Sequence, residues 1–206
     1  MNNKTRRLTV TALMAALTLI LGLTPVGYIP IPPVVMTLMC IPVIIGTITE
    51  GLGSGIVLGF IFGVTSLLKA LGVSLVPDLF GTWLMSGYPL VAILIIFIPR
   101  LLIPVVTYAV YRLLSRGQES GVRHKVSVGV AAFAGSITNT VLFLGFLYIL
   151  MMPHADALAG ALGVTKPALF GTVAGIGALN GLPEAAVAVL LCVPIIYAVQ
   201  KVKKKD

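Results

Sequence analysis

Charged side chains are scarce in this sequence. Of its 206 residues, 10% are Asp, Glu, Lys or Arg and 58% are hydrophobic, with a mean hydropathy of +1.10. A soluble domain averages about 25% charged residues, so this chain cannot cover a water-facing surface with polar groups. With roughly 20 residues for each helical span, its length allows six spans and short loops but no additional soluble catalytic domain. We predict an all-α, multi-pass protein of the cell membrane, with residues 1–206 forming a single six-span membrane domain.

The sequence motifs of common enzyme and metal sites are missing as well. There is no P-loop pattern, no H-E-x-x-H and no G-x-S-x-G. The two histidines, His124 and His154, are predicted to lie on opposite sides of the membrane, which argues against a metal cluster or a catalytic triad. Cys40 and Cys192 lie in apolar runs without a C-x-x-C partner, as packing residues do. We therefore expect no enzymatic activity, no cofactor and no metal in this chain.

Positive charge is in excess, with 14 Lys and Arg against 6 Asp and Glu. No basic face with interleaved aromatic residues supports nucleic-acid binding, and most basic residues instead flank hydrophobic runs, as topology determinants do. If the N-terminus is cytoplasmic, only Lys69 and Lys166 lie toward the outside. Eleven basic residues then lie inside: Lys4, Arg6, Arg7, Arg112, Arg116, Arg123, Lys125, Lys201, Lys203, Lys204 and Lys205. An odd number of spans would move the lysine tail outside, so we predict that both termini are cytoplasmic.

Six hydrophobic runs are predicted to be transmembrane helices. They cover about residues 8–23, 34–49, 54–71, 88–114, 126–152 and 168–200, and the last is expected to be irregular near Gly181 and Pro183. Three outer segments, 24–33, 72–87 and 153–167, connect them. The first two are longer than tight turns and carry aromatic residues, so they are either lids over a site or stiff connectors. The third is interpreted as a connector.

Arg100 is the clearest functional candidate, because it lies midway along the fourth span. Such a charge costs about 2.5–3.5 kcal/mol on insertion scales and suggests a functional role. Pro99 removes a backbone donor beside it, so we expect a kink and a freed carbonyl nearby. Counting along the other spans places Asn139, Asn180 and Glu184 at a similar depth. Either Arg100 and Glu184 form a structural ion pair, with the amides bonding neighbouring helices, or Arg100, Asn139 and Asn180 bind a ligand whose carboxylate pairs with the guanidinium.

Small residues recur at four-residue spacing on two spans. Gly55, Gly59 and Gly63 lie on the third span, where the pattern favours close internal helix packing. Ala12 and Ala16 lie near the cytoplasmic end of the first span. They either pack internally or present a smooth surface to a partner membrane protein.

Five segments together resemble a known family. They are Gly27-Tyr28-Ile29-Pro30-Ile31-Pro32-Pro33 leading into Thr37 and residues 41–46 (IPVIIG), the glycine-rich third span, residues 98–104 (IPRLLIP), residues 135–140 (GSITNT) and residues 180–185 (NGLPEA). From about Ala12 to Pro194 the chain is similar to the substrate-binding S components of energy-coupling factor (ECF) vitamin transporters. It most resembles the pantothenate type, although S components for pyridoxine-like compounds, hydroxymethylpyrimidine and folate share much of the pattern.

The resemblance implies a six-helix subunit that captures a vitamin from outside. Such a subunit works with a transmembrane T component and two cytoplasmic ATPases, whose ATP hydrolysis is coupled to toppling of the S component. The family's small-residue contact with the T component maps onto Ala12 and Ala16.

Under this interpretation each candidate site residue has a role. Arg100 would pair with the pantothenate carboxylate, and Asn139 and Asn180 would bond its amide and hydroxyls. Glu184 would orient Arg100 or touch the ligand. Trp83, Tyr28 and Tyr88 would wall or cap the pocket.

Two other classes remain open. A self-sufficient secondary transporter of a small anionic metabolite is one, although the sequence has no convincing internal repeat of the kind common in that class. The other is a membrane scaffold without a ligand, in which Arg100 and Glu184 have a purely structural role.

Overall fold

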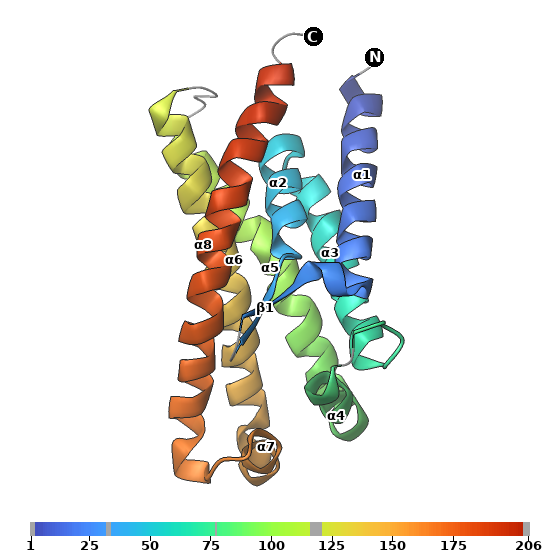
Figure 1. Ribbon diagram of the computed structural model, residues 1–206, viewed down its shortest axis with the longest axis vertical. Helices are drawn as coiled ribbons and strands as arrows, with labels where there is room; N and C mark the ends of the chain where they lie inside the picture. Colours follow the sequence, from blue (N-terminus) through green and yellow to red (C-terminus); the bar gives the residue numbers. More distant parts are fainter. Residues whose placement is uncertain (1–2, 32–33, 77, 116–120, 204–206) are drawn as a thin grey trace.

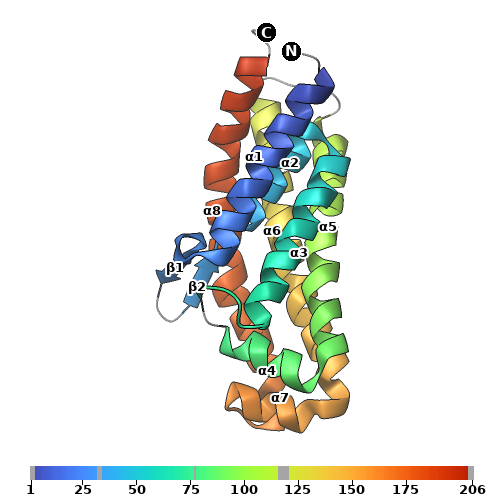
Figure 2. The ribbon, with the colours of Figure 1, turned by 90° about the vertical axis from the view of Figure 1, so that its right-hand side faces the viewer.

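The structure is a computed structural model that describes residues 3–31, 34–76, 78–115 and 121–203. Long helices run side by side along the molecule, and both chain termini lie at the same end (Figures 1 and 2). These helices are α1 (Asn3–Leu23), α2 (Cys40–Glu50), α3 (Leu52–Ala70), α5 (Pro89–Ser115), α6 (Val122–Met151) and α8 (Leu169–Lys203). The short helices α4 (Leu79–Gly87) and α7 (Ala155–Leu162) lie at the opposite end (Figure 1).

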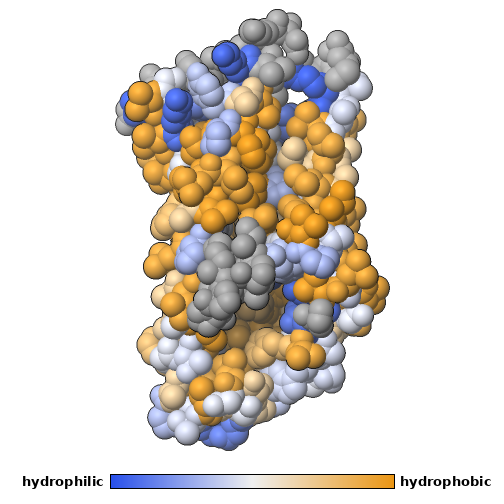
Figure 3. Space-filling model, in the orientation of Figure 1, coloured by the Kyte–Doolittle hydropathy of each residue, from blue (hydrophilic) through white to orange (hydrophobic). Residues whose placement is uncertain are grey.

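The helices have the length and composition of a membrane protein. Within the described ranges, five helical stretches are long and apolar enough to cross a bilayer: Lys4–Leu23, Leu52–Ala70, Pro89–Ser115, Val122–Leu162 and Lys166–Lys201. In Figure 3 hydrophobic residues cover much of the face between the two ends of the molecule, and hydrophilic residues gather at both ends. The prediction of a helical membrane protein is confirmed, apart from a two-stranded hairpin.

That hairpin corrects the predicted second span, 34–49. Strand β1 (Tyr28–Ile31) pairs antiparallel with β2 (Val34–Thr37), and α2 begins only at Cys40. The prolines of the first outer segment disfavour a helix, and the β-branched residues that follow suit a strand. With 11 residues and about 1.5 Å of rise per residue, α2 is about half as long as the roughly 30 Å hydrocarbon core is thick.

Two of the predicted outer segments, 72–87 and 153–167, contain short helices. The carboxylate of Asp78 caps the N-terminus of α4 by accepting a hydrogen bond from the Gly81 N–H, at 2.8 Å. Helix α7 lies within the predicted connector 153–167, between 3₁₀ turns at Met152–His154 and Lys166–Ala168. The irregularity expected near Gly181 and Pro183 is absent from the described α8, which is helical throughout. Membrane helices tolerate proline where neighbouring groups satisfy the freed backbone.

The interior contains two apolar clusters. One surrounds α2, whose residues from Cys40 to Ile48 are all buried, and includes Phe62 and Ile103. The second lies toward α4 and α7 and includes Leu84, Leu147 and Leu158. Arg100, Asn139 and Glu184, the polar residues predicted at mid-depth, line a cavity whose apolar walls come from both clusters.

The glycine face of α3 packs inward against α5, as predicted. A Cβ on Gly59 would lie 2.5 Å from the Arg100 carbonyl oxygen, and one on Gly63 would lie 2.8 Å from the Phe97 ring. Pro104 has no N–H to offer the Arg100 carbonyl four residues earlier. The close approach of α3 therefore occurs where a proline has freed a backbone oxygen of α5.

Candidate functional site

A cavity of about 250 Å³ lies in the half of the molecule nearer α4 and α7. The hairpin, α3, α4, α5, α6 and α8 all contribute to its wall. Its polar lining residues are Tyr28, Thr37, Ser66, Lys69, Asp78, Arg100, Asn139, Thr140, Asn180 and Glu184. Phe62, Phe80 and Phe143 are among its apolar walls. A cavity with apolar walls and a few converging polar groups is typical of a small-molecule site.

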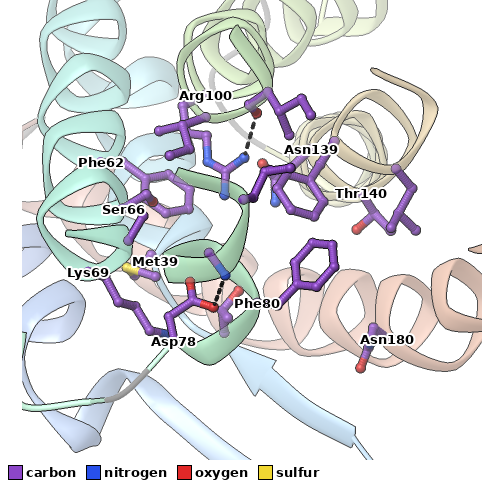
Figure 4. Close-up of a pocket in the computed structure, with 18 of the residues that line it drawn as sticks. Met39, Phe62, Ser66, Lys69, Asp78, Phe80, Arg100, Asn139, Thr140 and Asn180 are labelled. Atoms are coloured by element: carbon purple, nitrogen blue, oxygen red, sulfur yellow. Dashed lines mark hydrogen bonds between the residues drawn. The ribbon is translucent and has the colours of Figure 1, made fainter. Parts of the chain in front are cut away.

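Arg100 is held in place by the proline that precedes it. Pro99 leaves the Ile95 carbonyl without its helical donor, and Nη1 of Arg100 donates a hydrogen bond to that oxygen at 3.2 Å. The expected freed carbonyl is thus present, and the arginine itself satisfies it. The rings of Phe62 and Phe143 lie 5.2 and 5.0 Å from the guanidinium carbon, within the range of cation–π attraction. These contacts orient the side chain toward the cavity (Figure 4).

Three buried polar atoms in this cavity have no hydrogen-bond partner among the described residues. They are Nε of Arg100, Oδ1 of Asn139 and Oδ1 of Asn180, and they come from α5, α6 and α8. In Figure 4 the Arg100 and Asn139 side chains turn toward the same space. Buried polar atoms are almost always hydrogen-bonded, so this group is suited to a ligand that accepts from the guanidinium and donates to the amide oxygens.

Glu184 does not pair with Arg100. The salt bridge found in the described part of the chain is an exposed one, Lys166 to Asp156 at 2.7 Å. Oε1 of Glu184 instead accepts two hydrogen bonds from Thr37, from its backbone N–H at 2.8 Å and from its hydroxyl at 2.9 Å. The interpretation of Arg100 and Glu184 as a structural ion pair is therefore wrong, because β2 provides a nearer donor pair than α5 does.

Lys69 and Asp78 line the cavity but were not among the predicted site residues. The Lys69 ammonium lies 3.9 Å from the centre of the Tyr28 ring. The Tyr28 hydroxyl donates a hydrogen bond to the Gly22 carbonyl at 3.4 Å. The sequence signal was the position of Lys69, one of two basic residues predicted toward the outside.

Tyr28 lines the cavity, whereas Trp83 and Tyr88 are not among its lining residues. Trp83 packs with Phe80 and Tyr88, at centroid distances of 5.6 and 6.0 Å, and Tyr88 also stacks on His154 at 4.6 Å. Because residues 79–87 form a helix, one face turns inward and the other away. Phe80 and Leu84, four residues apart, lie on the inward face.

Ala12 and Ala16 are exposed on the surface of α1, while Ala15 packs against the apolar core. Internal packing therefore does not explain the two outward alanines. The same end of α1 is fastened to α3 by polar contacts, since Arg7 donates to the Ser54 hydroxyl at 3.2 Å and Thr11 to the same oxygen at 3.0 Å.

Two comparisons with known proteins identify the family of this chain. Residues 6–196 match the family described as "ECF transporter, substrate-specific component". The chain is also 32% identical over 183 residues to a protein of Lactococcus lactis subsp. cremoris (strain MG1363) named pantothenic acid transporter PanT. That similarity covers 84% of this chain and 82% of the relative. With a family match over nearly its whole length and several membrane-crossing helices, this chain belongs to the substrate-specific components of ECF transporters, which are multi-pass proteins of the cell membrane.

Proposed function

We propose that this chain binds pantothenate and serves in its uptake as the S component of an ATP-driven ECF transporter. The observation that carries the proposal is a group of three buried polar atoms in one cavity, on Arg100, Asn139 and Asn180, for which the described residues provide no hydrogen-bond partner. The name of the Lactococcus relative supports the choice of vitamin.

The cavity chemistry suits the functional groups of pantothenate. Its carboxylate would accept hydrogen bonds from Arg100, whose planar fork favours that group. Its amide and hydroxyl groups would donate to Asn139 and Asn180, and its geminal methyl groups would pack on the phenylalanine walls. Glu184 and Asp78 already accept hydrogen bonds from Thr37 and Gly81, so neither carboxylate has to turn toward the anionic ligand.

We further propose that the chain crosses the membrane six times, with both termini in the cytoplasm and residues 1–206 as one domain. The hairpin and α2 together would make the second crossing. Two observations support this topology: both termini lie at the same end of the molecule, and the basic residues concentrate at that end.

The proposed partners are a transmembrane T component and two ATPase subunits, with Ala12 and Ala16 forming the contact on α1. The exposure of these alanines supports the assignment, because small residues let a second helix approach closely. Uptake into liposomes would need all four chains and ATP. Uptake by this chain alone would instead favour a secondary transporter.

Calorimetric titration of the purified chain with pantothenate tests the proposal. We expect saturable binding with a 1:1 stoichiometry, and weaker binding after Asn139→Leu or Asn180→Leu. Each of these variants should cost about two- to tenfold in affinity, since a hydrogen bond contributes about 0.5–1.5 kcal/mol. Ser136→Ala is the matched control, because it removes a buried hydroxyl of α6 that has no hydrogen-bond partner among the described residues and does not line the cavity. If the chain binds another water-soluble vitamin but not pantothenate, the choice of vitamin is wrong.

A further inference from the structure

We propose that Glu184 is a positioning residue that fastens the β1–β2 hairpin to α8 beside the cavity, and so sets the rates at which ligand enters and leaves. The identity of the ligand rests on the proposed function above, whereas the fastening rests on the structure alone.

The contact is a double hydrogen bond to one oxygen atom. Oε1 of Glu184 accepts from both the N–H and the hydroxyl of Thr37, residues 147 positions apart in the sequence. Glu184 is 8% exposed, so water competes little for these bonds. Among the described hydrogen bonds, these two are the ones that join the hairpin to α8.

The hairpin is held at its base from several sides. Tyr28 and Thr37 are opposite each other in the strand register, and both line the cavity. Tyr28 is tied to α1 through the Gly22 carbonyl and faces the Lys69 ammonium of α3. Thr37 is tied to α8 through Glu184. Figure 2 shows the rest of the hairpin projecting from the side of the bundle.

Because of this placement, the cavity can open between the hairpin and α8 at the contact of Thr37 with Glu184. Thr37 on the hairpin and Asn180 with Glu184 on α8 form adjoining parts of the cavity wall. A passage between the hairpin and α8 can open only if the two hydrogen bonds to Glu184 break. Their strength then contributes to the barrier for entry as well as for exit.

Because both hydrogen bonds go to Oε1 of Glu184, substitutions can separate the loss of the hydrogen bonds from the loss of the charge. A glutamine side chain retains an Oε1 acceptor, so Glu184→Gln keeps the fastening and removes only the charge. Glu184→Ala removes the fastening. Thr37→Val removes one of the two donors, and Thr37→Ser is its matched control because serine keeps the hydroxyl.

Stopped-flow or surface-based kinetics with pantothenate should measure both rate constants for each variant. We expect Glu184→Ala to raise both the association and the dissociation rate by about tenfold or more, and Thr37→Val to raise both by less. Glu184→Gln should restore the slow rates, as should Thr37→Ser. If Glu184→Gln is as impaired as Glu184→Ala, the charge is what matters and the proposal is wrong. A change in dissociation alone, or in neither rate, also overturns it.

Amide hydrogen exchange separates this proposal from the choice of ligand. In the ligand-free protein, the Thr37 amide should exchange faster in Glu184→Ala than in the wild type, and Glu184→Gln should restore its protection. If the wild-type chain does not bind pantothenate, the proposed function fails while this readout still tests the fastening. Equal exchange in Glu184→Ala and wild type contradicts the fastening. Should Glu184→Ala fail to fold, the comparison of Thr37→Val with Thr37→Ser carries the test.

Discussion

Two stripes of small residues in this protein have the same sequence spacing and opposite surroundings. Gly55, Gly59 and Gly63 on α3 turn inward against neighbouring helices, whereas Ala12 and Ala16 on α1 are exposed. The two helices differ in the same way: 39% of the apolar stretch of α3 is buried inside the protein, against only 11% of the apolar stretch of α1. Small-residue spacing thus predicts a close helix approach, but burial decides whether the approaching helix belongs to the same chain.

The largest effect is expected from filling the inward stripe at Gly59. A Cβ there meets a backbone oxygen of α5, which cannot rotate away. Gly59→Val should therefore destabilise the chain by about 1–3 kcal/mol or more and abolish pantothenate binding. Thermal unfolding in detergent measures the loss. Gly145→Val on α6 is the matched control, because nothing lies within 4 Å of its Cβ position. If the two variants are equally stable, α3 can move away from α5 to accommodate the larger side chain, and the expectation is wrong.

A more selective effect is expected from the outward stripe. Ala12→Trp and Ala16→Trp should block co-purification of this chain with the T component while leaving pantothenate affinity within about twofold, because both positions are exposed and lie outside the cavity. Val141→Trp places the same bulk on an exposed position of α6 and should allow assembly. If the alanine variants lose ligand binding instead, α1 has an internal role and the contrast between the stripes fails.

The smallest effect is expected at Gly63, where the obstruction is a side chain. A Cβ would lie 2.8 Å from the Phe97 ring, and Phe97 is only half-buried and can shift. Gly63→Ala should cost less than about 1.5 kcal/mol of stability, in the range of tolerated core changes. Thermal unfolding of Gly63→Ala and Gly59→Val side by side measures which variant loses more stability. A larger loss of stability in Gly63→Ala would contradict the expectation that a side chain gives way more easily than a backbone oxygen.

The parts of the fold and site that follow from local sequence were predictable. Pro99 removes a helical donor, so a freed carbonyl near Arg100 was expected; it is that of Ile95, and Arg100 itself donates to it. Counting along the spans was enough to place Arg100, Asn139 and Asn180 at one depth, and they line one cavity.

The remaining features depend on tertiary contacts or on ambiguous local patterns. The bond from Glu184 to Thr37 joins distant segments, and no spacing rule indicates it. Residues 34–37 form a short apolar run, which periodicity cannot assign to strand or helix. Trp83 was expected to wall or cap the pocket because it lies in an aromatic-bearing outer segment, whereas in the helix at 79–87 it packs on Phe80 and Tyr88 and does not line the cavity.

We propose that Arg100 holds the carboxylate of the ligand. Titration of wild type and Arg100→Ala with pantothenate, and with pantothenol as an uncharged analogue, tests it most directly. Truncating one partner of a buried charge pair costs about 2–5 kcal/mol, so Arg100→Ala should weaken pantothenate binding by about thirtyfold or more and affect pantothenol far less. An unchanged pantothenate affinity in Arg100→Ala, or an equal loss for both compounds, would contradict the account.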